Sequence, residues 1–325
     1  MIAVKDIEQR ELSLTTRFPF KYGIASLTQA PQHYVIAEVE IDGRTHKGVA
    51  ADLLPPKWFT KSPDTHFEED AEQMRHVIQQ ARDFARAIEP QPDVFSFWKQ
   101  LYQQQREWGK VDNLPPLLTN FGVSLVERAV IDAFCRSTDT CFHDAVHSNT
   151  LGIQLGEIHA ELDRSSPADW LPAKPVPSIN LRHTAGLGDP LTDDDIDEQN
   201  RLNDGLPHSL VDNISRYQLT HFKVKLCGKI DTDVPRLRAI AAILRQHVGD
   251  QCRLTLDGNE QYHSGEAFRE AWQQFEADDE IRWLIDHLIF VEQPFHRDVA
   301  LSQKLGEALR NWKQRPPMII DESDG

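Results

Sequence analysis

The second half of the sequence alternates short apolar runs with segments of helical pattern, and this alternation constrains the fold more than any other feature. Strand, helix and strand at this spacing predict right-handed βαβ units and a parallel sheet. Either a (β/α) barrel or an open doubly wound sheet fits, and no GxGxxG motif follows any run, which makes a nucleotide-binding sheet the weaker alternative. The apolar runs are 176–182, 220–226, 253–257, 288–292 and 318–321, and the helical patterns between them are 195–218, 233–247, 264–276 and 298–312.

Three successive apolar runs end in a carboxylate, at Asp257, Glu292 and Asp321. In a parallel barrel the carboxyl ends of all strands open onto one face, so these side chains are expected to converge. A single Asp at a strand end is often only a helix N-cap, but three in succession indicate a shared site. Converging carboxylates repel one another unless a cation cancels their charge, and oxygen ligands of this kind favour Mg²⁺.

The run before these three carries two lysines, Lys223 and Lys225. They are two residues apart, so in a strand both ammonium groups leave the same face. Taken alone, the pair fits an exposed edge strand as well as it fits a functional site. Because like charges on one sheet face are costly, their position just before three carboxylates favours the functional interpretation.

The chain of 325 residues, 40% of them hydrophobic, is long enough for two domains. The first is predicted to span residues 1–150 and to begin with β-rich sequence, and the second to span 151–325. A boundary near 149–175 is suggested by the Ser- and Pro-containing segments 165–167 and 171–177. In the first domain we predict strands at 34–41 and 45–54 joined by an Asp-Gly turn, loops at 19–31 and 53–63, and helices at 66–89, 94–108 and 124–146.

The charge balance excludes some classes of partner. With 35 Lys and Arg against 51 Asp and Glu the net charge is −16, which argues against nucleic acid or an anionic membrane as a partner. The most apolar stretches have the length of strands, so no segment is expected to span a bilayer. The four cysteines form no CxxC pair, which predicts reduced thiols and a cytoplasmic protein.

Four short motifs follow one another in a recognisable order. Lys-x-Lys at 223–225, Asp-Gly-Asn at 257–259, Val-Glu-Gln-Pro at 291–294 and Ile-Asp-Glu-Ser at 320–323 resemble the enolase superfamily, in its mandelate racemase and muconate-lactonizing branch. The resemblance covers most of the chain and implies an α/β fold, a (β/α) barrel of enolase-superfamily type with an N-terminal α+β capping domain. Asp within Asp-Glu-Ser resembles the muconate-lactonizing, dipeptide-epimerase and succinylbenzoate-synthase types more than the racemases.

The resemblance implies an isomerase or lyase that is a homo-oligomer and acts on a small carboxylate substrate. Its reaction would be Mg²⁺-dependent removal of the proton α to the carboxylate through a metal-stabilised enediolate, leading to racemisation or epimerisation, cycloisomerisation or elimination. Mn²⁺ is the alternative ion. The implied general base is Lys225, with Lys223 stabilising the oxyanion and Asn259 beside the substrate. The implied metal ligands are Asp257, Glu292 and Asp321.

The sequence departs from the family pattern at its end. About 150 residues follow the start of the first predicted barrel strand, against about 250 in a full eight-fold barrel. We therefore expect only about five βα units, a barrel truncated after its fifth strand, and a second acid or base beyond Gly325. The alternatives are a sugar-acid dehydratase of the same superfamily and a non-catalytic, metal-binding remnant or scaffold of that fold.

Overall fold

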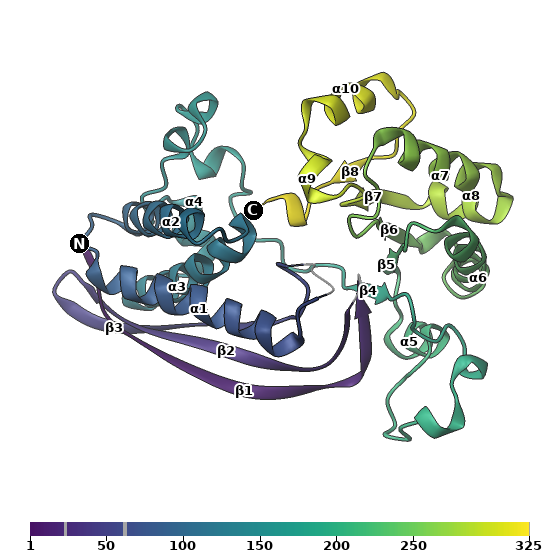
Figure 1. Cartoon of the computed structure of the whole chain (residues 1–325), viewed down its shortest axis with the longest axis horizontal. Helices are drawn as coiled ribbons and strands as arrows, with labels where there is room; N and C mark the ends of the chain where they lie inside the picture. Colours follow the sequence, from purple (N-terminus) through teal and green to yellow (C-terminus); the bar gives the residue numbers. More distant parts are fainter. Residues whose placement is uncertain (23–24, 61–63, 325) are drawn as a thin grey trace. The chain divides into compact units, whose positions relative to one another are not determined.

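The computed structural model describes residues 1–22, 25–60 and 64–324, which form two compact units (Figure 1). As far as they are described, Met1–Pro19 and Leu27–Ser178 belong to the first unit, and Phe20–Ser26 and Ile179–Asp324 to the second. The predicted domain boundary between residues 150 and 151 stays a prediction.

A three-stranded sheet in the order β1-β2-β3 begins the chain, with β1 at Ile2–Tyr22, β2 at Ala25–Ile41 and β3 at Arg44–Leu53. Strands β2 and β3 pair antiparallel from Gln32 and Leu53 to Ile41 and Arg44. Asp42 and Gly43 between them have φ values of 48° and 82°, the left-handed geometry of a two-residue hairpin turn. The predicted hairpin and its turn are confirmed.

The prediction of a loop at 19–31 is wrong for its described residues, because they continue β1 and β2. Its flanking prolines do not break the sheet. Pro19 lies on β1, an edge strand that can lack an N–H, and the Pro31 carbonyl accepts the Leu54 N–H at 2.9 Å. Residues 23–24 of this predicted loop, and 61–63 of the one at 53–63, lie outside the described residues.

Helices α1 (Phe67–Ala87), α2 (Val94–Val111) and α3 (Pro116–Ser137) cover one face of this sheet (Figure 1). The first two confirm the predicted helices. The third prediction, 124–146, is wrong in extent. Helix α3 starts at Pro116, a residue suited to the first helical turn, and ends before Asp139, whose φ of 51° is left-handed. A separate helix, α4, follows at Phe142–His147.

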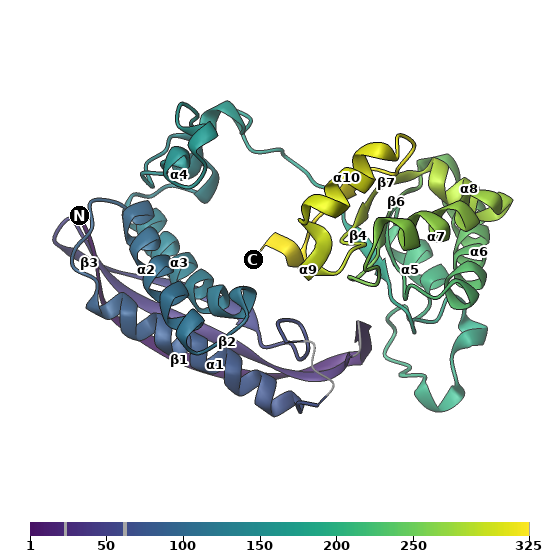
Figure 2. The same cartoon turned by 45° about the horizontal axis from the view of Figure 1, so that its top comes forward.

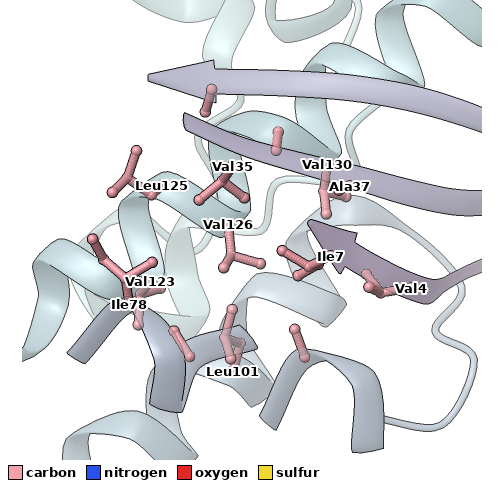
Figure 3. Packing of buried hydrophobic residues seen from close by; sticks show 14 of the residues in the cluster. Val4, Ile7, Val35, Ala37, Ile78, Leu101, Val123, Leu125, Val126 and Val130 are labelled. Atoms are coloured by element: carbon pink, nitrogen blue, oxygen red, sulfur yellow. The ribbon is translucent and has the colours of Figure 1, made fainter. Parts of the chain in front are cut away.

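The core of the first unit lies between the sheet and these helices. Figure 3 shows Val35 of β2 close to Val126 of α3, and both side chains are fully buried. A Cβ added at Gly48 would lie 2.0 Å from the Ala129 carbonyl oxygen, so β3 approaches the α3 backbone directly. Close packing of this kind fixes the sheet on the helices.

The second unit is built on five parallel strands: β4 (Arg182–Ala185), β5 (His221–Lys225), β6 (Arg253–Asp257), β7 (Leu288–Glu292) and β8 (Met318–Ile319). Their order in the sheet is their order in the chain. A doubly wound sheet reverses its strand order, whereas a barrel does not, so the order favours the barrel alternative. The predicted α/β fold is confirmed.

The helices of the second unit alternate with its strands, and Figure 2 shows α6, α7 and α8 together on one side of them. Helix α8 was not predicted, and the pattern at 298–312 forms two helices instead of one. The helices are α5 (Leu210–Tyr217), α6 (Ile230–His247), α7 (Gly265–Ala277), α8 (Asp279–Asp286), α9 (Arg297–Ala300) and α10 (Gln303–Asn311).

Two further predictions at the start of this unit are wrong. The first strand was expected at 176–182, but β4 begins at Arg182. Pro177 lacks an N–H for a sheet, and Ile179 is 86% exposed, so the apolar residues before β4 are not strand core. The helix expected at 195–218 forms only at Leu210–Tyr217, because short 3₁₀ turns occupy the acidic stretch before it. No helix among the described residues is long and apolar enough to cross a membrane.

Candidate active site

The alternation of strand side chains divides β5 between two environments. Phe222 and Val224 are buried in the apolar core beneath the helices, with 1% and 0% exposure. Lys223 and Lys225 therefore leave the opposite face, as the sequence predicted. Asp257 is the residue of β6 in register with Lys225.

The carboxyl ends of β5, β6 and β7 bring two lysines and two carboxylates into direct contact. Lys223 Nζ lies 2.8 Å from Asp257 Oδ2 and 2.6 Å from Glu292 Oε1. Lys225 Nζ lies 3.0 Å from Asp257 Oδ2 and donates a hydrogen bond to Asn259 Oδ1 at 2.7 Å. Five of the six predicted site residues, Lys223, Lys225, Asp257, Asn259 and Glu292, thus form one connected polar cluster.

Asp321 joins this cluster through Glu292. It follows the short strand β8 and is partly buried. Burial, together with the charge of Glu292 and a hydrogen bond to it, raises the pKa of the Asp321 carboxyl. Asp321 therefore lies near Glu292, whose strand β7 lies between β6 and β8. The convergence of all three carboxylates on one ion stays a prediction.

The cluster is buried, which strengthens every charge interaction in it. Lys225, Asp257 and Glu292 are 6%, 2% and 5% exposed. Burial alone would lower the pKa of Lys223, but Asp257 and Glu292 outweigh it and raise that pKa. Burial alone would raise the pKa of Asp257, but the charges of Lys225 and Lys223 hold it below its ordinary value. Lys223 and Asp257 are accordingly both charged at neutral pH.

Sequence reasoning missed Arg182 as a site residue. Its Nη1 lies 3.2 Å from Glu292 Oε2 and donates a hydrogen bond to Thr255 Oγ1 at 3.0 Å. The sequence did contain a signal, because Arg182 ends the apolar run that precedes the lysine strand. That run, 176–182, was predicted to be the first strand, whereas most of it forms the segment before β4. Arg182 is thus the second basic side chain beside Glu292, after Lys223.

The backbone after β6 and β7 adopts an uncommon conformation. Asn259, Glu260 and Gln293 have φ values of 45°, 65° and 37°, in the left-handed region that residues other than glycine seldom enter. Such conformations persist only where the surroundings hold them, and they concentrate at functional sites. Asn259 and Glu260 lie two and three residues after Asp257, and Gln293 directly follows Glu292.

The donor set suits a hard divalent cation, because it consists of carboxylate and amide oxygens. Glu292 Oε2 is buried, and no described residue donates a hydrogen bond to it. Within the part of the chain that the structure describes, however, no three Asp, Glu, His or Cys side chains are grouped as a ready metal site. The Lys223 ammonium lies between Asp257 and Glu292. The assignment of Asp257, Glu292 and Asp321 as metal ligands stays a prediction.

Solved structures share this fold at low sequence identity. A mandelate racemase/muconate lactonizing protein from Herpetosiphon aurantiacus has a TM-score of 0.60 and 17% identity over 99% of this chain and 68% of its own. For the N-succinyl Arg/Lys racemase of Bacillus cereus the values are 0.58 and 14%, over 98% of this chain and 66% of that one. A dipeptide epimerase from Enterococcus faecalis, complexed with Mg and a dipeptide, has a TM-score of 0.56 and 16% identity over 99% and 68%.

No family model matches the chain, and no curated protein matches it either. The solved structures cover nearly all of this chain, while the chain spans about two thirds of their length. The resemblance seen in the four motifs is confirmed at the level of the fold. This chain has the fold of the mandelate racemase and muconate-lactonizing branch of the enolase superfamily.

Proposed function

We propose that this chain removes the proton α to the carboxylate of a small acid, in a Mg²⁺-dependent reaction. The observation that carries the proposal is the contact of Lys223 and Lys225 with Asp257 at 2.8 and 3.0 Å, on the side of the sheet away from the helices. The proposed outcomes are racemisation or epimerisation, cycloisomerisation or elimination, which makes the protein an isomerase or a lyase.

Lys225 is the proposed base, and its Nζ would accept the α-proton. Asp257 and Asn259 fix the position of this nitrogen with contacts of 3.0 and 2.7 Å, so little movement is needed to meet a substrate held above them. A buried amine close to a carboxylate can hold or release a proton as the charges around it change. Asn259 would also bind the substrate.

Lys223 is proposed to stabilise the negative charge that develops on the substrate carboxylate. Its raised pKa keeps it an ammonium at neutral pH, which is the form this role requires. The two lysines would thus have different roles on the same face of β5.

Asp257, Glu292 and Asp321 are the proposed ligands of Mg²⁺, with Mn²⁺ as the alternative. When bound, the ion would supply positive charge for binding the substrate carboxylate and stabilising its deprotonated form. Support comes from the oxygen donors, among them Glu292 Oε2, which is buried and accepts no hydrogen bond from a described residue, although Arg182 Nη1 lies 3.2 Å from it. The E. faecalis epimerase contains Mg, and an enolase from Bradyrhizobium is complexed with magnesium and mandelic acid. The proposed location is the cytoplasm and the proposed assembly a homo-oligomer, both from the sequence.

Exchange of the α-proton with solvent tests the proposal without knowledge of the product. Mandelate, a dipeptide and an N-succinyl amino acid would each be incubated with the chain in D₂O, with Mg²⁺ or with a chelator. The expected result is Mg²⁺-dependent loss of the α-proton NMR signal for at least one acid. Mg²⁺ binding without exchange on any acid would instead support the non-catalytic scaffold. The alternative function, a sugar-acid dehydratase, would be recognised by a different reaction, the loss of water from a sugar acid to give a keto acid.

A further inference from the structure

The side chain of Gln293, directly after Glu292, is held on all sides. It is 1% exposed. Its Oε1 accepts hydrogen bonds from the backbone N–H groups of Asp321 at 2.7 Å and Ser323 at 3.4 Å. Its Nε2 donates to the Ser323 hydroxyl and to the Phe295 carbonyl, both at 2.7 Å. The partners fix the orientation of the amide, because its oxygen faces N–H donors and its nitrogen faces a carbonyl.

The backbone of Gln293 makes two more links. Its N–H donates to the Ile319 carbonyl of β8, and its carbonyl accepts the Glu260 N–H, both at 2.9 Å. Its φ of 37° is left-handed, so the surroundings hold this residue against its ordinary preference. One residue therefore joins the segments that follow β6, β7 and β8.

The sheet does not place Asp321 in the way it places the other two carboxylates. Asp257 and Glu292 are members of β6 and β7 and pair with each other in register. Strand β8 pairs with β7 only through Met318 and Ile319, and so it ends before Asp321. The hydrogen bond from the Asp321 N–H to the Gln293 side chain takes the place of a strand pairing there.

We propose that Gln293 is a positioning residue that sets the Asp321 carboxylate beside Glu292. The inference rests on the proposed function, in which Asp321 and Glu292 bind the same divalent ion. Gln293 acts through Asp321, because its side-chain oxygen accepts hydrogen bonds from the backbone N–H groups of Asp321 and Ser323 and so fixes the backbone that carries the carboxylate. Without that amide, the Asp321 carboxylate would spend part of its time in positions from which it cannot bind the same ion as Glu292. The affinity for the divalent ion would therefore fall.

The test replaces the amide by an apolar side chain of similar length. Mn²⁺ affinity, followed by electron paramagnetic resonance, would be compared for the wild-type chain, Gln293→Met and the control Gln303→Met. Gln303 is an exposed glutamine of α10, and its amide nitrogen donates a hydrogen bond to Glu307 Oε1 at 2.9 Å. Gln293→Met is expected to weaken Mn²⁺ binding about tenfold to hundredfold, the usual range for residues that orient ligands. The control is expected to leave it unchanged.

A double-mutant cycle separates positioning from general damage to the fold. If Gln293 acts through Asp321, adding Gln293→Met to Asp321→Asn should weaken Mn²⁺ binding by less than about twofold further. Equal losses in both backgrounds would overturn the proposal, as would unchanged Mn²⁺ affinity of Gln293→Met. If the wild-type chain bound no Mn²⁺ at all, the proposed function would fail and this role with it, so the two failures are distinguishable.

A second readout does not depend on the metal. Amide hydrogen exchange, measured by mass spectrometry, reports whether the segment containing Asp321 is held in place. Gln293→Met is expected to increase exchange in residues 320–324 at least about tenfold, while Gln303→Met leaves it unchanged. Protection of this segment that persists in Gln293→Met would overturn the role of Gln293.

Discussion

Single residues at the candidate site form an alternating series of charges. Lys223 lies between Asp257 and Glu292, and Asp257 lies between Lys223 and Lys225. Because these groups are buried, each depends on its neighbours for the stabilisation that water would otherwise give. The same arrangement gives the two lysines different surroundings, since only Lys225 also contacts the neutral Asn259. This difference in surroundings is consistent with separate roles for Lys223 and Lys225.

A second buried ion pair lies next to this series. Glu260, whose side chain is 1% exposed, accepts hydrogen bonds from Arg297 Nε at 2.7 Å and Nη2 at 2.8 Å. Arg297→Met would leave that carboxylate buried with fewer donors. We expect the free energy of unfolding to fall by about 3–5 kcal/mol, measured by urea denaturation. Arg310→Met, at an exposed position of α10, is the control and should change it by less than about 0.5 kcal/mol. Equal effects of the two variants would contradict this account.

The first unit contains a charge cluster that predicts a pH dependence of stability. Glu11 contacts Arg75 and His33, each at 2.8 Å, and the hydrogen bond from Arg75 is the main cause that holds the Glu11 pKa below its ordinary value. A depressed carboxyl pKa adds stability above the unfolded-state pKa, about 4.3, and this stability is lost as the pH falls through the folded-state pKa.

Replacing Glu11 by Gln removes this contribution. The melting temperature of Glu11→Gln should therefore be lower than that of the wild-type chain at pH 7. The difference should shrink as the pH falls below about 4. Calorimetry across this pH range measures it, and a difference that stays constant with pH would contradict the assigned cause.

At the scale of elements, the sequence predicts best where hydrophobic alternation and neighbouring turns agree. The bounds of β6 and β7 were predicted without error, because each apolar run ends at a carboxylate and a turn. The start of β4 was missed because Val176, Ile179 and Leu181 are apolar but exposed. Apolar character alone does not distinguish a strand from a connecting segment.

The residues of the candidate site that lie on strands could be predicted as well as the strands themselves. Lys223, Lys225, Asp257 and Glu292 follow from strand periodicity and parallel register. Residues outside that periodicity, such as Gln293, could not be found, because their role depends on which distant backbone groups they meet. Sequence order carries no record of those long-range hydrogen bonds.

The contact between β3 and α3 gives a prediction at the element scale. A Cβ at Gly48 would lie 2.0 Å from the Ala129 carbonyl oxygen, which belongs to a helix backbone and cannot easily move. Gly48→Ala is expected to lower the free energy of unfolding by about 1–3 kcal/mol. Gly306→Ala is the control, because the nearest atom to its Cβ, at 3.3 Å, is the end of the flexible Arg310 side chain. Thermal denaturation of both variants measures the effect, and tolerance of Gly48→Ala would refute the close contact.

At the scale of the whole molecule, the chain is acidic, but the candidate site is rich in basic side chains. The net charge of −16 is that of the whole chain, whereas the site gathers three basic side chains, Lys223, Lys225 and Arg182, on the face of the parallel sheet away from the helices. Sites of parallel α/β folds lie at the carboxyl ends of their strands, so the location follows from the architecture. The chemistry follows from the side chains present there.

The most direct measurement of the central claim is α-proton exchange by Lys225→Ala, compared with the wild-type chain and with Lys229→Ala. Lys229 is an exposed lysine just before α6 and serves as the matched control. The account predicts that Lys225→Ala loses at least about 100-fold in exchange rate, within the usual range for a general base, while it still binds Mg²⁺. Lys229→Ala should exchange at the wild-type rate. Exchange that persists in Lys225→Ala would contradict the assignment of Lys225 as the base.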